Sequence, residues 1–471
     1  MRRTVLLSVA IALAVLLVSE VWSGAAREAR TLTKKPNIVF IIAEDMRFDD
    51  LRYMPKTRSA LKDRGMAFQN AFVSTPQCCP SRATIMRGQY AHNTGVWNIA
   101  NPDGGWQTYR AKGLERDNVA TRLHDAGYSN GLFGKYLNGY GRSTTPPPGW
   151  DNWFAFKQPE YYNYDVNDNG TIRHFGTTNS DYSTDVLKRE VQEFIGANAT
   201  QGKPFFAYVT PYAPHRPATA APRDRHTFDQ EKAPRLPSFN EVDVSDKPPW
   251  IQSLRRLTSA DIANIDKRHE NRVESLQAVD DLVAGVVGKL RDKGVLSNTY
   301  LFFTSDNGFQ SGEHRIPRKK GRPYEESVNV PLLVRGPGVT PGRHAQKLVL
   351  NTDYLPTFTD LGDAKTPGYA DGRSLQPVLE GNATTWRSAI LLEADRTVAG
   401  TTSHFSVIRT SSGPKYVRYA EGKRELYYLG GDPYELRNSY DPNSPPTTLA
   451  TRLNALKTCS AASCRKAENG Q

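Results

Sequence analysis

Side chains that can hold a metal ion or move protons follow four short apolar runs of this chain. In chain order these polar groups are Glu44 and Asp45, Gly134 and Lys135, Pro214 and His215, and the segment 305–308 with Asp306 and Asn307. Carboxylate and amide oxygens suit Ca²⁺ or Mg²⁺, whereas Lys and His donate protons to anions. Any one of them could be an ordinary helix cap or turn residue. Four such groups in the same position predict a shared site.

Hydrophobic patterning predicts the elements that must position these groups. Runs rich in β-branched and aromatic residues are typical of buried strands, and they cover residues 37–43, 128–133, 204–210, 300–304 and 330–334. Helical periodicity runs from about Arg268 to Lys293, with Gly294 as its stop, and from about Ser183 to Ile195. Alternating strands and helices predict an α/β fold with a mostly parallel central sheet. The polar groups would then meet at the carboxyl ends of its strands.

The remaining patterns predict a long loop and a second, smaller domain. Residues 216–257 are rich in Pro and charge, and we expect them to form a rim over the site. From about Arg387 the chain changes to short alternating strands and turns, with a helix near residues 449–456. We therefore expect a larger domain that carries the site over 36–380 and a small antiparallel α+β domain over 387–471.

Composition and charge exclude some classes of protein. The 471 residues are 38% hydrophobic and 23% charged, which is typical of a globular chain and excludes overall disorder. The net charge of +12 favours an anionic partner, such as nucleic acid, an acidic membrane surface or an acidic polysaccharide. Positive residues are scattered singly and no nucleic-acid-binding motif occurs, so we predict no nucleic-acid partner.

The N-terminus has the pattern of a secretory signal peptide. Arg2 and Arg3 precede an apolar run over residues 5–18, and small residues follow over 23–26. This apolar run is too short for a stable membrane span, although an uncleaved anchor is the alternative. We expect cleavage near residue 25 and a secreted protein, which would be extracellular, periplasmic or lysosomal depending on its source.

The four cysteines form two pairs with different expectations. Cys459 and Cys464 have a spacing that suits a small disulfide-closed loop in an oxidising compartment, with free thiols as the alternative. Cys78 and Cys79 are adjacent and could bridge each other only with strain. This second pair therefore needs a different explanation.

That explanation comes from a family resemblance. The segment Cys78-Cys-Pro-Ser-Arg-Ala-Thr-Ile-Met-Arg-Gly88 resembles the signature of the type I sulfatases, in which the first Cys is oxidised to formylglycine. The resemblance covers almost the whole mature chain, in family order. Its other motifs are Pro36-Asn-Ile-Val to Glu44-Asp45, Gly134-Lys-Tyr-Leu-Asn-Gly-Tyr140, Ala213-Pro-His-Arg-Pro217, Thr304-Ser-Asp-Asn-Gly308, Lys320 ahead of Pro323-Tyr-Glu-Glu, and Asp432-Pro-Tyr-Glu-Leu-Arg-Asn438.

The resemblance implies a fold, two cofactors and a set of site residues. The fold is an alkaline-phosphatase-like sandwich, and the cofactors are Ca²⁺, or Mg²⁺, and a formylglycine made from Cys78 by a formylglycine-generating enzyme. The implied metal ligands are Glu44, Asp45, Cys78, Asp306 and Asn307. The implied catalytic residues are Cys78, Arg82, Lys135, His215, Asp306 and Lys320.

The family mechanism gives these residues their roles. A hydroxyl of hydrated formylglycine, activated by the metal and Asp306, attacks sulfur in line while the alcohol leaves. His215 or Lys320 protonates the leaving oxygen. The second hydroxyl then collapses to the aldehyde and expels sulfate. A helix that begins just after Cys78 would aim its amide dipoles at the same anion.

Two positions depart from the common family pattern. Glu44 stands where most relatives have Asp, and Leu137 stands where many have His. The Gly-Lys-Tyr-Leu-Asn form resembles the branch of glucosamine-6-sulfatases and extracellular glucosamine endosulfatases. In that branch Asn138 would take a polar role near the substrate, and His314 is a further candidate substrate contact.

The leading hypothesis is hydrolysis of a sulfate ester, namely the 6-O-sulfate of N-acetylglucosamine in glycosaminoglycans or another sulfated sugar. The alternative enzyme is a phosphonate or phosphodiester hydrolase of the same fold. A hypothesis from another class is a secreted protein that binds sulfated glycans without turnover, which Glu44, Leu137 and the positive charge would suit.

Overall fold

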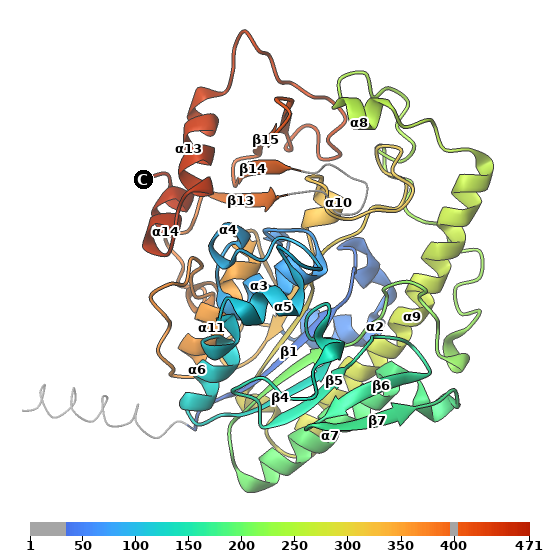
Figure 1. The fold of residues 1–471 in the computed structure, drawn as a ribbon, viewed down its shortest axis with the longest axis vertical. Helices are drawn as coiled ribbons and strands as arrows, with labels where there is room; N and C mark the ends of the chain where they lie inside the picture. Colours follow the sequence, from blue (N-terminus) through green and yellow to red (C-terminus); the bar gives the residue numbers. More distant parts are fainter. Residues whose placement is uncertain (1–33, 396–403) are drawn as a thin grey trace, which may run out of the picture. The chain divides into compact units, whose positions relative to one another are not determined.

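A ten-stranded mixed sheet forms the centre of the fold (Figure 1). The computed structural model describes residues 34–395 and 404–471. The strand order is β11-β2-β10-β9-β1-β8-β4-β5-β6-β7. These strands are β1 (Asn37–Ala43), β2 (Met66–Phe68), β4 (Ser129–Gly134), β5 (Asn152–Phe156), β6 (Tyr164–Asp168), β7 (Thr171–Phe175), β8 (Phe205–Thr210), β9 (Thr299–Ser305), β10 (Leu332–Arg335) and β11 (Arg343–Ala345).

The middle of this sheet confirms the predicted α/β class. Strands β9, β1, β8, β4 and β5 are neighbours and run parallel, whereas β10 runs antiparallel to β9. All five predicted strands are present, and their ends agree with the prediction to within one or two residues. The register places Ala43 beside Ser305 and Gly134 beside Thr210. The polar groups that follow these strands therefore emerge at one edge of the sheet.

Helices cover both faces of the sheet (Figure 1). Along β1, Ile38, Phe40 and Ile42 face a core that includes residues of α3, α6 and α11. Val39 and Ile41 face the opposite core, which includes residues of α7 and α9. The helices are α2 (Pro55–Thr57), α3 (Cys78–Arg87), α4 (Ala91–Thr94), α5 (Gly105–Ala111), α6 (Val119–Asp125), α7 (Ser183–Gln201), α8 (Pro249–Gln252), α9 (Ser259–Asp292), α10 (Glu325–Val328), α11 (Tyr354–Leu361), α12 (Gln376–Leu379), α13 (Thr447–Lys457) and α14 (Ala462–Asn469).

The long helix α9 begins nine residues before its predicted start at Arg268. Its N-cap is Thr258, whose side chain accepts a hydrogen bond from the Asp261 amide at 3.3 Å, while the Asp261 carboxylate accepts one from the Thr258 amide at 2.8 Å. This capping box is the sequence pattern that could have indicated the start of α9. Hydrophobic periodicity missed it, because Ile265 is the only residue of these first nine that is buried.

The long loop forms a rim over the site only at its start. Of residues 216–257, only Arg216, Pro217 and Ala218 line the large cavity described below. The rest packs elsewhere. For example, Lys247 donates to the carbonyl of Leu436 at 2.6 Å.

A second, four-stranded antiparallel sheet follows the large one in the chain. Its strands are β13 (Ala389–Ala394), β14 (Phe405–Thr410), β15 (Pro414–Tyr419) and β16 (Arg424–Tyr428), and a separate two-stranded sheet pairs β3 (Ala71–Phe72) with β12 (Val349–Leu350). The predicted C-terminal helix is α13, and its Leu453 and Leu456 join the core beneath this sheet.

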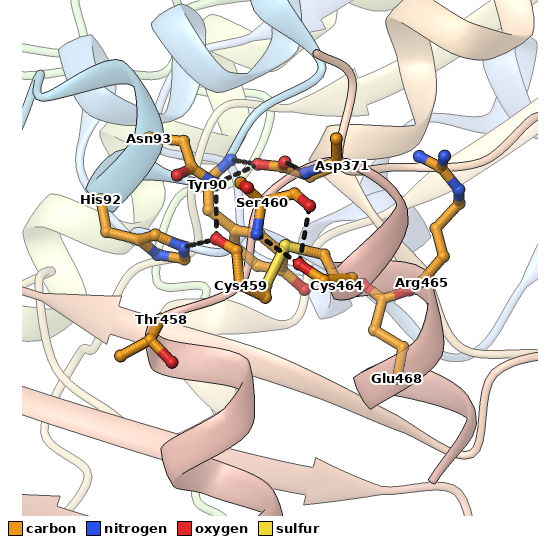
Figure 2. The surroundings of a disulfide bond; sticks show 12 residues. Tyr90, His92, Asn93, Asp371, Thr458, Cys459, Ser460, Cys464, Arg465 and Glu468 are labelled. Atoms are coloured by element: carbon orange, nitrogen blue, oxygen red, sulfur yellow. Dashed lines mark hydrogen bonds between the residues drawn. A yellow bond between two sulfur atoms is a disulfide. The ribbon is translucent and has the colours of Figure 1, made fainter. Parts of the chain in front are cut away.

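The predicted disulfide between Cys459 and Cys464 is confirmed (Figure 2). It closes the turn between α13 and α14. The Cys459 carbonyl accepts hydrogen bonds from Asn93 Nδ2 at 3.0 Å and from His92 Nε2 at 2.9 Å. The turn is therefore held by side chains of α4, which comes more than 360 positions earlier in the chain.

The expected signal peptide over residues 1–25 lies outside the described residues. Within the described part of the chain, no helix is long and apolar enough to cross a membrane. The domain division at 380–387 stays a prediction.

Gly134 is the last residue of β4, and a substitution there tests the close contact between β4 and β8. Its φ is +113°, and a Cβ there would collide with the backbone carbonyl of Thr210. We expect Gly134→Ala to lower the free energy of unfolding by about 2 kcal/mol or more, because it adds strain and pushes β4 from β8. Urea unfolding measures this change.

The matched control is Gly288→Ala in α9, where a Cβ meets nothing within 4 Å. Helix propensity predicts that this variant gains about 0.5–1 kcal/mol. Equal effects at the two positions would contradict the collision at Gly134.

Candidate active site

The nucleophile position predicted from the sequence lines a cavity of about 1300 Å³. Cys78 is the first residue of α3 and is 3% exposed. Gln77 before it is extended, and α3 ends at Gly88 in the left-handed conformation. The positive end of the α3 dipole therefore lies at Cys78, where it favours an anion.

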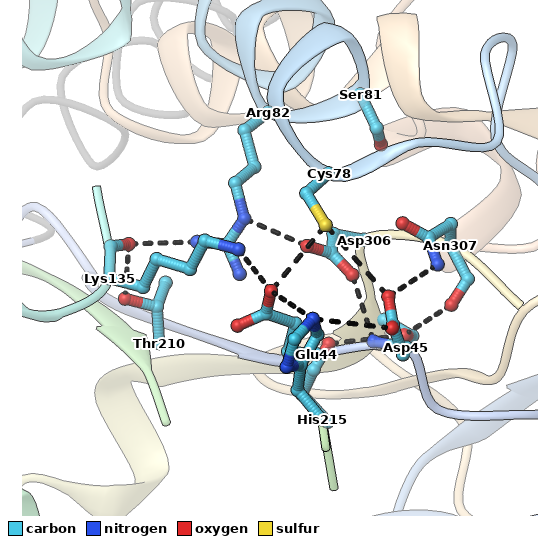
Figure 3. Close-up of polar contacts among 12 residues, drawn as sticks. Glu44, Asp45, Cys78, Ser81, Arg82, Lys135, Thr210, His215, Asp306 and Asn307 are labelled. Atoms are coloured by element: carbon cyan, nitrogen blue, oxygen red, sulfur yellow. Dashed lines mark hydrogen bonds and ion pairs between the residues drawn. The ribbon is translucent and has the colours of Figure 1, made fainter. Parts of the chain in front are cut away.

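Carboxylates from two parallel strands converge on Cys78 (Figure 3). Its Sγ lies 3.4 Å from Glu44 Oε1 and 3.9 Å from Asp45 Oδ1. The Asp45 amide donates to Asp306 Oδ1 at 3.1 Å, and Asn307 Nδ2 donates to Asp45 Oδ1 at 2.8 Å. Asp45 has a φ of +60°, a conformation that non-glycine residues adopt at a cost. This conformation is held by the bonds to Asp306 and Asn307.

Each carboxylate has a cationic partner. Lys135 pairs with Glu44, and Lys320 pairs with Asp45. Arg82 Nε lies 2.8 Å from an Asp306 oxygen. The cations come from α3, from the end of β4 and from the loop before α10, so that three separate segments neutralise one site.

Lys320 and Arg82 also tie the site together. Lys320 Nζ lies 2.7 Å from Cys78 Sγ, and Arg82 Nη1 donates to the Lys135 carbonyl at 2.8 Å. The nucleophile position is therefore in contact with a cation as well as with carboxylates.

His215 approaches from the end of β8. Its Nε2 lies 3.8 Å from Asp45 Oδ2 and 3.9 Å from Glu44 Oε1. Its Nδ1 lies 2.8 Å from the Arg216 carbonyl, which can only accept. Nδ1 therefore carries a proton, and Nε2 faces the site. Because the side chain is 21% exposed and lines the cavity, a substrate can reach it.

Electrostatics keeps the acids ionised and the thiol neutral. Burial opposes ionisation of Glu44 and Asp45, but Lys135, Lys320 and His215 outweigh it and hold both pKa values below their usual range. Burial raises the pKa of Cys78 to about 12, against the opposing effect of Lys135 and Lys320. An unmodified Cys78 is therefore a neutral thiol and a poor nucleophile at neutral pH.

The donor set fits a hard divalent cation. Glu44, Asp45 and Cys78 place ligand atoms within 4.8 Å of one another. Glu44 Oε2 and Asn307 Oδ1 are buried acceptors with no hydrogen-bond partner among the described residues. Buried oxygen atoms without donors are costly unless something electropositive contacts them. Carboxylate and amide oxygens in this arrangement suit Ca²⁺ or Mg²⁺.

Two neighbouring positions were singled out from the sequence, Leu137 as a departure from the family pattern and Asn138 as a polar residue near the substrate. Asn138 and Leu137 both line the cavity. Asn138 Oδ1 is another buried acceptor with no partner in the described part of the chain, so it can accept a hydrogen bond from a ligand. Leu137 offers only an apolar surface.

The prediction that His314 contacts substrate is wrong. His314 is fully buried and does not line the cavity. Its Nδ1 lies 2.7 Å from Glu241 Oε2, and its ring packs against Tyr324 at 4.2 Å between centroids. The pattern of polar groups directly after a strand does not include His314, which lies further along the loop after β9. This loop turns the His314 side chain into the protein.

Sequence reasoning missed most of the cavity wall. Trp97, Lys157 and Glu160 come from loops and a strand end that carry no recognisable pattern, and Asp395 follows β13 of the second sheet. Arg318 and Lys319, which directly precede Lys320, also line the cavity. Their position beside Lys320 was the only sequence pattern that could have indicated this part of the wall.

Comparisons with known proteins agree with this geometry. The Sulfatase family model matches residues 36–364, and the model for the C-terminal part of N-sulphoglucosamine sulphohydrolase matches residues 312–459. The N-acetylglucosamine-6-sulfatase of Capra hircus is 34% identical over 94% of this chain and 86% of its own. The Homo sapiens enzyme is 33% identical over 92% of this chain and 86% of its own.

Solved structures show the same fold. A protein in complex with its substrate D-glucosamine-2-N,6-O-disulfate has a TM-score of 0.74 at 22% identity, covering 93% of this chain and 100% of that one. The phosphonate monoester hydrolase of Agrobacterium radiobacter has a TM-score of 0.69 at 22% identity, covering 89% of this chain and 94% of that one.

Calcium binding tests the oxygen cluster. We expect Ca²⁺ at about 100 times its Kd to stabilise the wild-type chain by about 2.7 kcal/mol, measured as a rise in Tm. Asn307→Ala removes one unpartnered oxygen and should weaken Ca²⁺ binding by about tenfold or more, measured by calorimetry. Asp281→Asn, an acid that pairs with Lys56 away from the cavity, is the control. Equal affinities of the two variants would exclude Asn307 as a ligand.

Glu326 lies beside His314 and predicts a pH-dependent stability. Burial and the neighbouring Glu313 raise its pKa from 4.5 to about 7. The folded chain therefore holds a proton that the unfolded chain releases above about pH 4.5, so stability is lost as the pH rises towards 7. Glu326→Gln should be more stable than the wild type at pH 8, by roughly 2 kcal/mol, and this gain should shrink towards pH 5.

Urea unfolding at both pH values measures the Glu326 effect. The exposed Glu193 of α7 provides the matched change, Glu193→Gln. If Glu326→Gln shows the same difference from the wild type at pH 5 and at pH 8, the raised pKa is refuted.

Proposed function

The chain belongs to the sulfatase family, and on that basis we propose that it removes the 6-O-sulfate of N-acetylglucosamine units in sulfated glycans through a formylglycine made from Cys78. It is a sulfuric ester hydrolase, so a role limited to glycan binding is set aside. The observation that carries the proposed chemistry is the contact of Cys78 Sγ with Lys320 and with the carboxylates of Glu44 and Asp45. The choice of sugar is supported by the N-acetylglucosamine-6-sulfatase relatives.

A formylglycine and a divalent cation would divide the chemistry between them. Formylglycine at position 78, when hydrated, supplies a hydroxyl nucleophile and a route to release sulfate. Glu44, Asp45, Asp306 and Asn307 would hold a Ca²⁺, which would supply Lewis-acid chemistry at the sulfate. The remaining steps belong to the side chains that the structure describes.

Charge stabilisation belongs to the buried cations. A sulfate monoester repels nucleophiles through its anionic oxygens, and negative charge passes to the leaving oxygen as the S–O bond breaks. Lys135 and Lys320 are fixed beside the Cys78 side chain by their carboxylate partners, so they need no reorganisation when charge develops. Arg82 holds Asp306 and the Lys135 carbonyl, and thereby orients both.

His215 is a better candidate than Lys320 for protonating the leaving oxygen. Asp45 raises the pKa of Lys320 despite its burial, so that this ammonium releases a proton only reluctantly. His215 carries a proton on Nδ1, which is bonded to a carbonyl, and its Nε2 faces the cavity. When His215 is doubly protonated, its Nε2 proton can pass to the departing alcohol, and the neutral ring that results keeps its proton on Nδ1.

We also propose that the chain is exported and matured outside the cytoplasm. The sequence pattern over residues 1–25 and the Cys459–Cys464 disulfide both support an oxidising compartment. Conversion of Cys78 requires a formylglycine-generating enzyme in the same route.

Replacing Cys78 tests the proposed nucleophile. Cys78→Ala should lower sulfate release from N-acetylglucosamine 6-sulfate by at least about 10³-fold, because no nucleophile remains. Ion chromatography measures the sulfate, and peptide mass spectrometry across position 78 detects formylglycine. The neighbouring Cys79→Ala is the matched control, and it should keep the modification and most of the activity.

Substrate comparison tests the proposed ester. Rates on an aryl sulfate and an aryl phosphodiester separate a sulfatase from a phosphodiester hydrolase of the same fold. Hydrolysis of the aryl sulfate without sulfate release from any amino-sugar ester would overturn the substrate but keep the chemistry. A plain thiol at position 78 in active enzyme would overturn the nucleophile.

A further inference from the structure

The cations that line the cavity include a group that pairs with carboxylates of the site and a group that does not. Lys135 and Lys320 line the cavity and are paired with carboxylates. Arg268, Arg318 and Lys319 line the same cavity, and none of the three forms an ion pair with an acid of the described chain. We call these three residues the outer cation cluster. The first group already has a role in the proposed mechanism, so the second group needs an explanation of its own.

The outer cation cluster is held in place by backbone contacts. Arg268 lies in the third turn of α9, and its Nη2 donates to the Pro317 carbonyl at 3.1 Å. The Gln310 amide donates to the Lys319 carbonyl at 2.8 Å, within an isolated antiparallel bridge between these two residues. The loop that carries Arg318 and Lys319 is therefore fixed against both α9 and the segment after β9.

The members of the cluster repel one another. Burial and Arg318 lower the pKa of Arg268. Burial together with Arg322 and Arg318 lowers the pKa of Lys319. Positive side chains gathered on a cavity wall without carboxylate partners are stabilised by an anion that enters the cavity.

The nearby acids do not neutralise the cluster. Asp395 and Glu160 also line the cavity, but Asp395 pairs with His404 at 2.6 Å, and Glu160 forms no ion pair with the cluster. Asp261, the acid that acts on Arg268, pairs with Arg255 at 2.6 Å instead. The positive charge of the cluster is therefore available to a ligand.

The position of the cluster fits a substrate that carries two anionic groups. Lys319 directly precedes Lys320, whose Nζ is 2.7 Å from Cys78 Sγ, so the cluster begins one residue from the lysine that contacts the nucleophile position. The cavity of about 1300 Å³ exceeds the roughly 300–1,000 Å³ of ordinary ligand pockets. It has room for more than the sugar that bears the reacting ester.

We propose that Arg268, Arg318 and Lys319 form a subsite for a second anionic group of the glycan, a sulfate or a carboxylate. This group is carried either by the sugar that bears the reacting ester or by its neighbour in the chain. The inference rests on the proposed function, and it makes the enzyme selective for polyanionic substrates over a sugar with a single sulfate.

Three substrates separate these sources. N-acetylglucosamine 6-sulfate has one anionic group, glucosamine 2-N,6-O-disulfate has a second one on the same sugar, and a uronic acid-containing disaccharide has it on the neighbouring sugar. In Arg318→Gln/Lys319→Gln, kcat/KM for a doubly anionic substrate relative to the monosulfate should fall by about tenfold or more, mainly through KM. Arg268→Gln should lower the same ratio.

The control variant is Lys232→Gln, which removes one positive charge from an exposed position outside the cavity. It should leave the ratio within about twofold of the wild type, because a distant charge acts only through a screened field. A fall for the disulfate places the second anion on the same sugar, and a fall for the disaccharide places it on the neighbour. An unchanged ratio for both substrates overturns the subsite.

Binding separates failure of the subsite from failure of the proposed function. Calorimetry with a trisulfated heparin disaccharide uses Cys78→Ala protein, which needs no turnover. Adding Arg318→Gln/Lys319→Gln to it should weaken binding by about tenfold, while adding Lys232→Gln should not. If the wild type releases no sulfate from any sugar but this loss is seen, the subsite stands and the substrate is wrong. If affinity is unchanged, the subsite is wrong whatever the substrate.

Discussion

The gathering of three buried carboxylates, Glu44, Asp45 and Asp306, is the constraint on which the rest of this structure depends. Removing such charges from water is expensive, and their mutual repulsion adds to that cost. The fold offsets this cost by placing one cation beside each carboxylate, and the three cations come from different segments, as Figure 3 shows for Lys135 and Arg82. Loss of any one cation would leave a buried charge without its partner. Sheet, helix α3 and the loop before α10 are thus fixed relative to one another by electrostatic balance as well as by packing.

The same arrangement keeps both the carboxylates and the cations of the site charged. The carboxylates stay ionised because the cations hold their pKa values down, and the cations stay charged because the carboxylates are there. A divalent cation and a sulfate ester can be accommodated together only where both signs of charge are already present. The excess positive charge of the whole chain had pointed merely to some anion. Along the cavity wall it now divides into cations that build the site and cations left over for a ligand.

Much of the fold followed from the sequence, because buried strands and the polar groups after them form strong local patterns. β1 and β9 were predicted almost to the residue, and with them the convergence of Asp45 and Asn307. Elements without an apolar face were not predictable in this way, as the exposed first turns of α9 illustrate. His314 was misjudged for a related reason, since a loop has no periodicity that tells which way a side chain points. The outer wall of the cavity depends on how distant loops pack, and this is set by tertiary contacts alone.

One consequence concerns the order in which the chain folds. Asn307 and Asp45 touch although 262 positions separate them, whereas the Cys459–Cys464 bridge spans only 5. Contacts between such distant residues form only after the intervening segments have lost most of their freedom. The oxygen cluster is therefore completed late, after β8 and α9 have been placed between its halves. A nascent or partly unfolded chain has no assembled centre, so any binding of a divalent cation there is a direct reporter of completed folding.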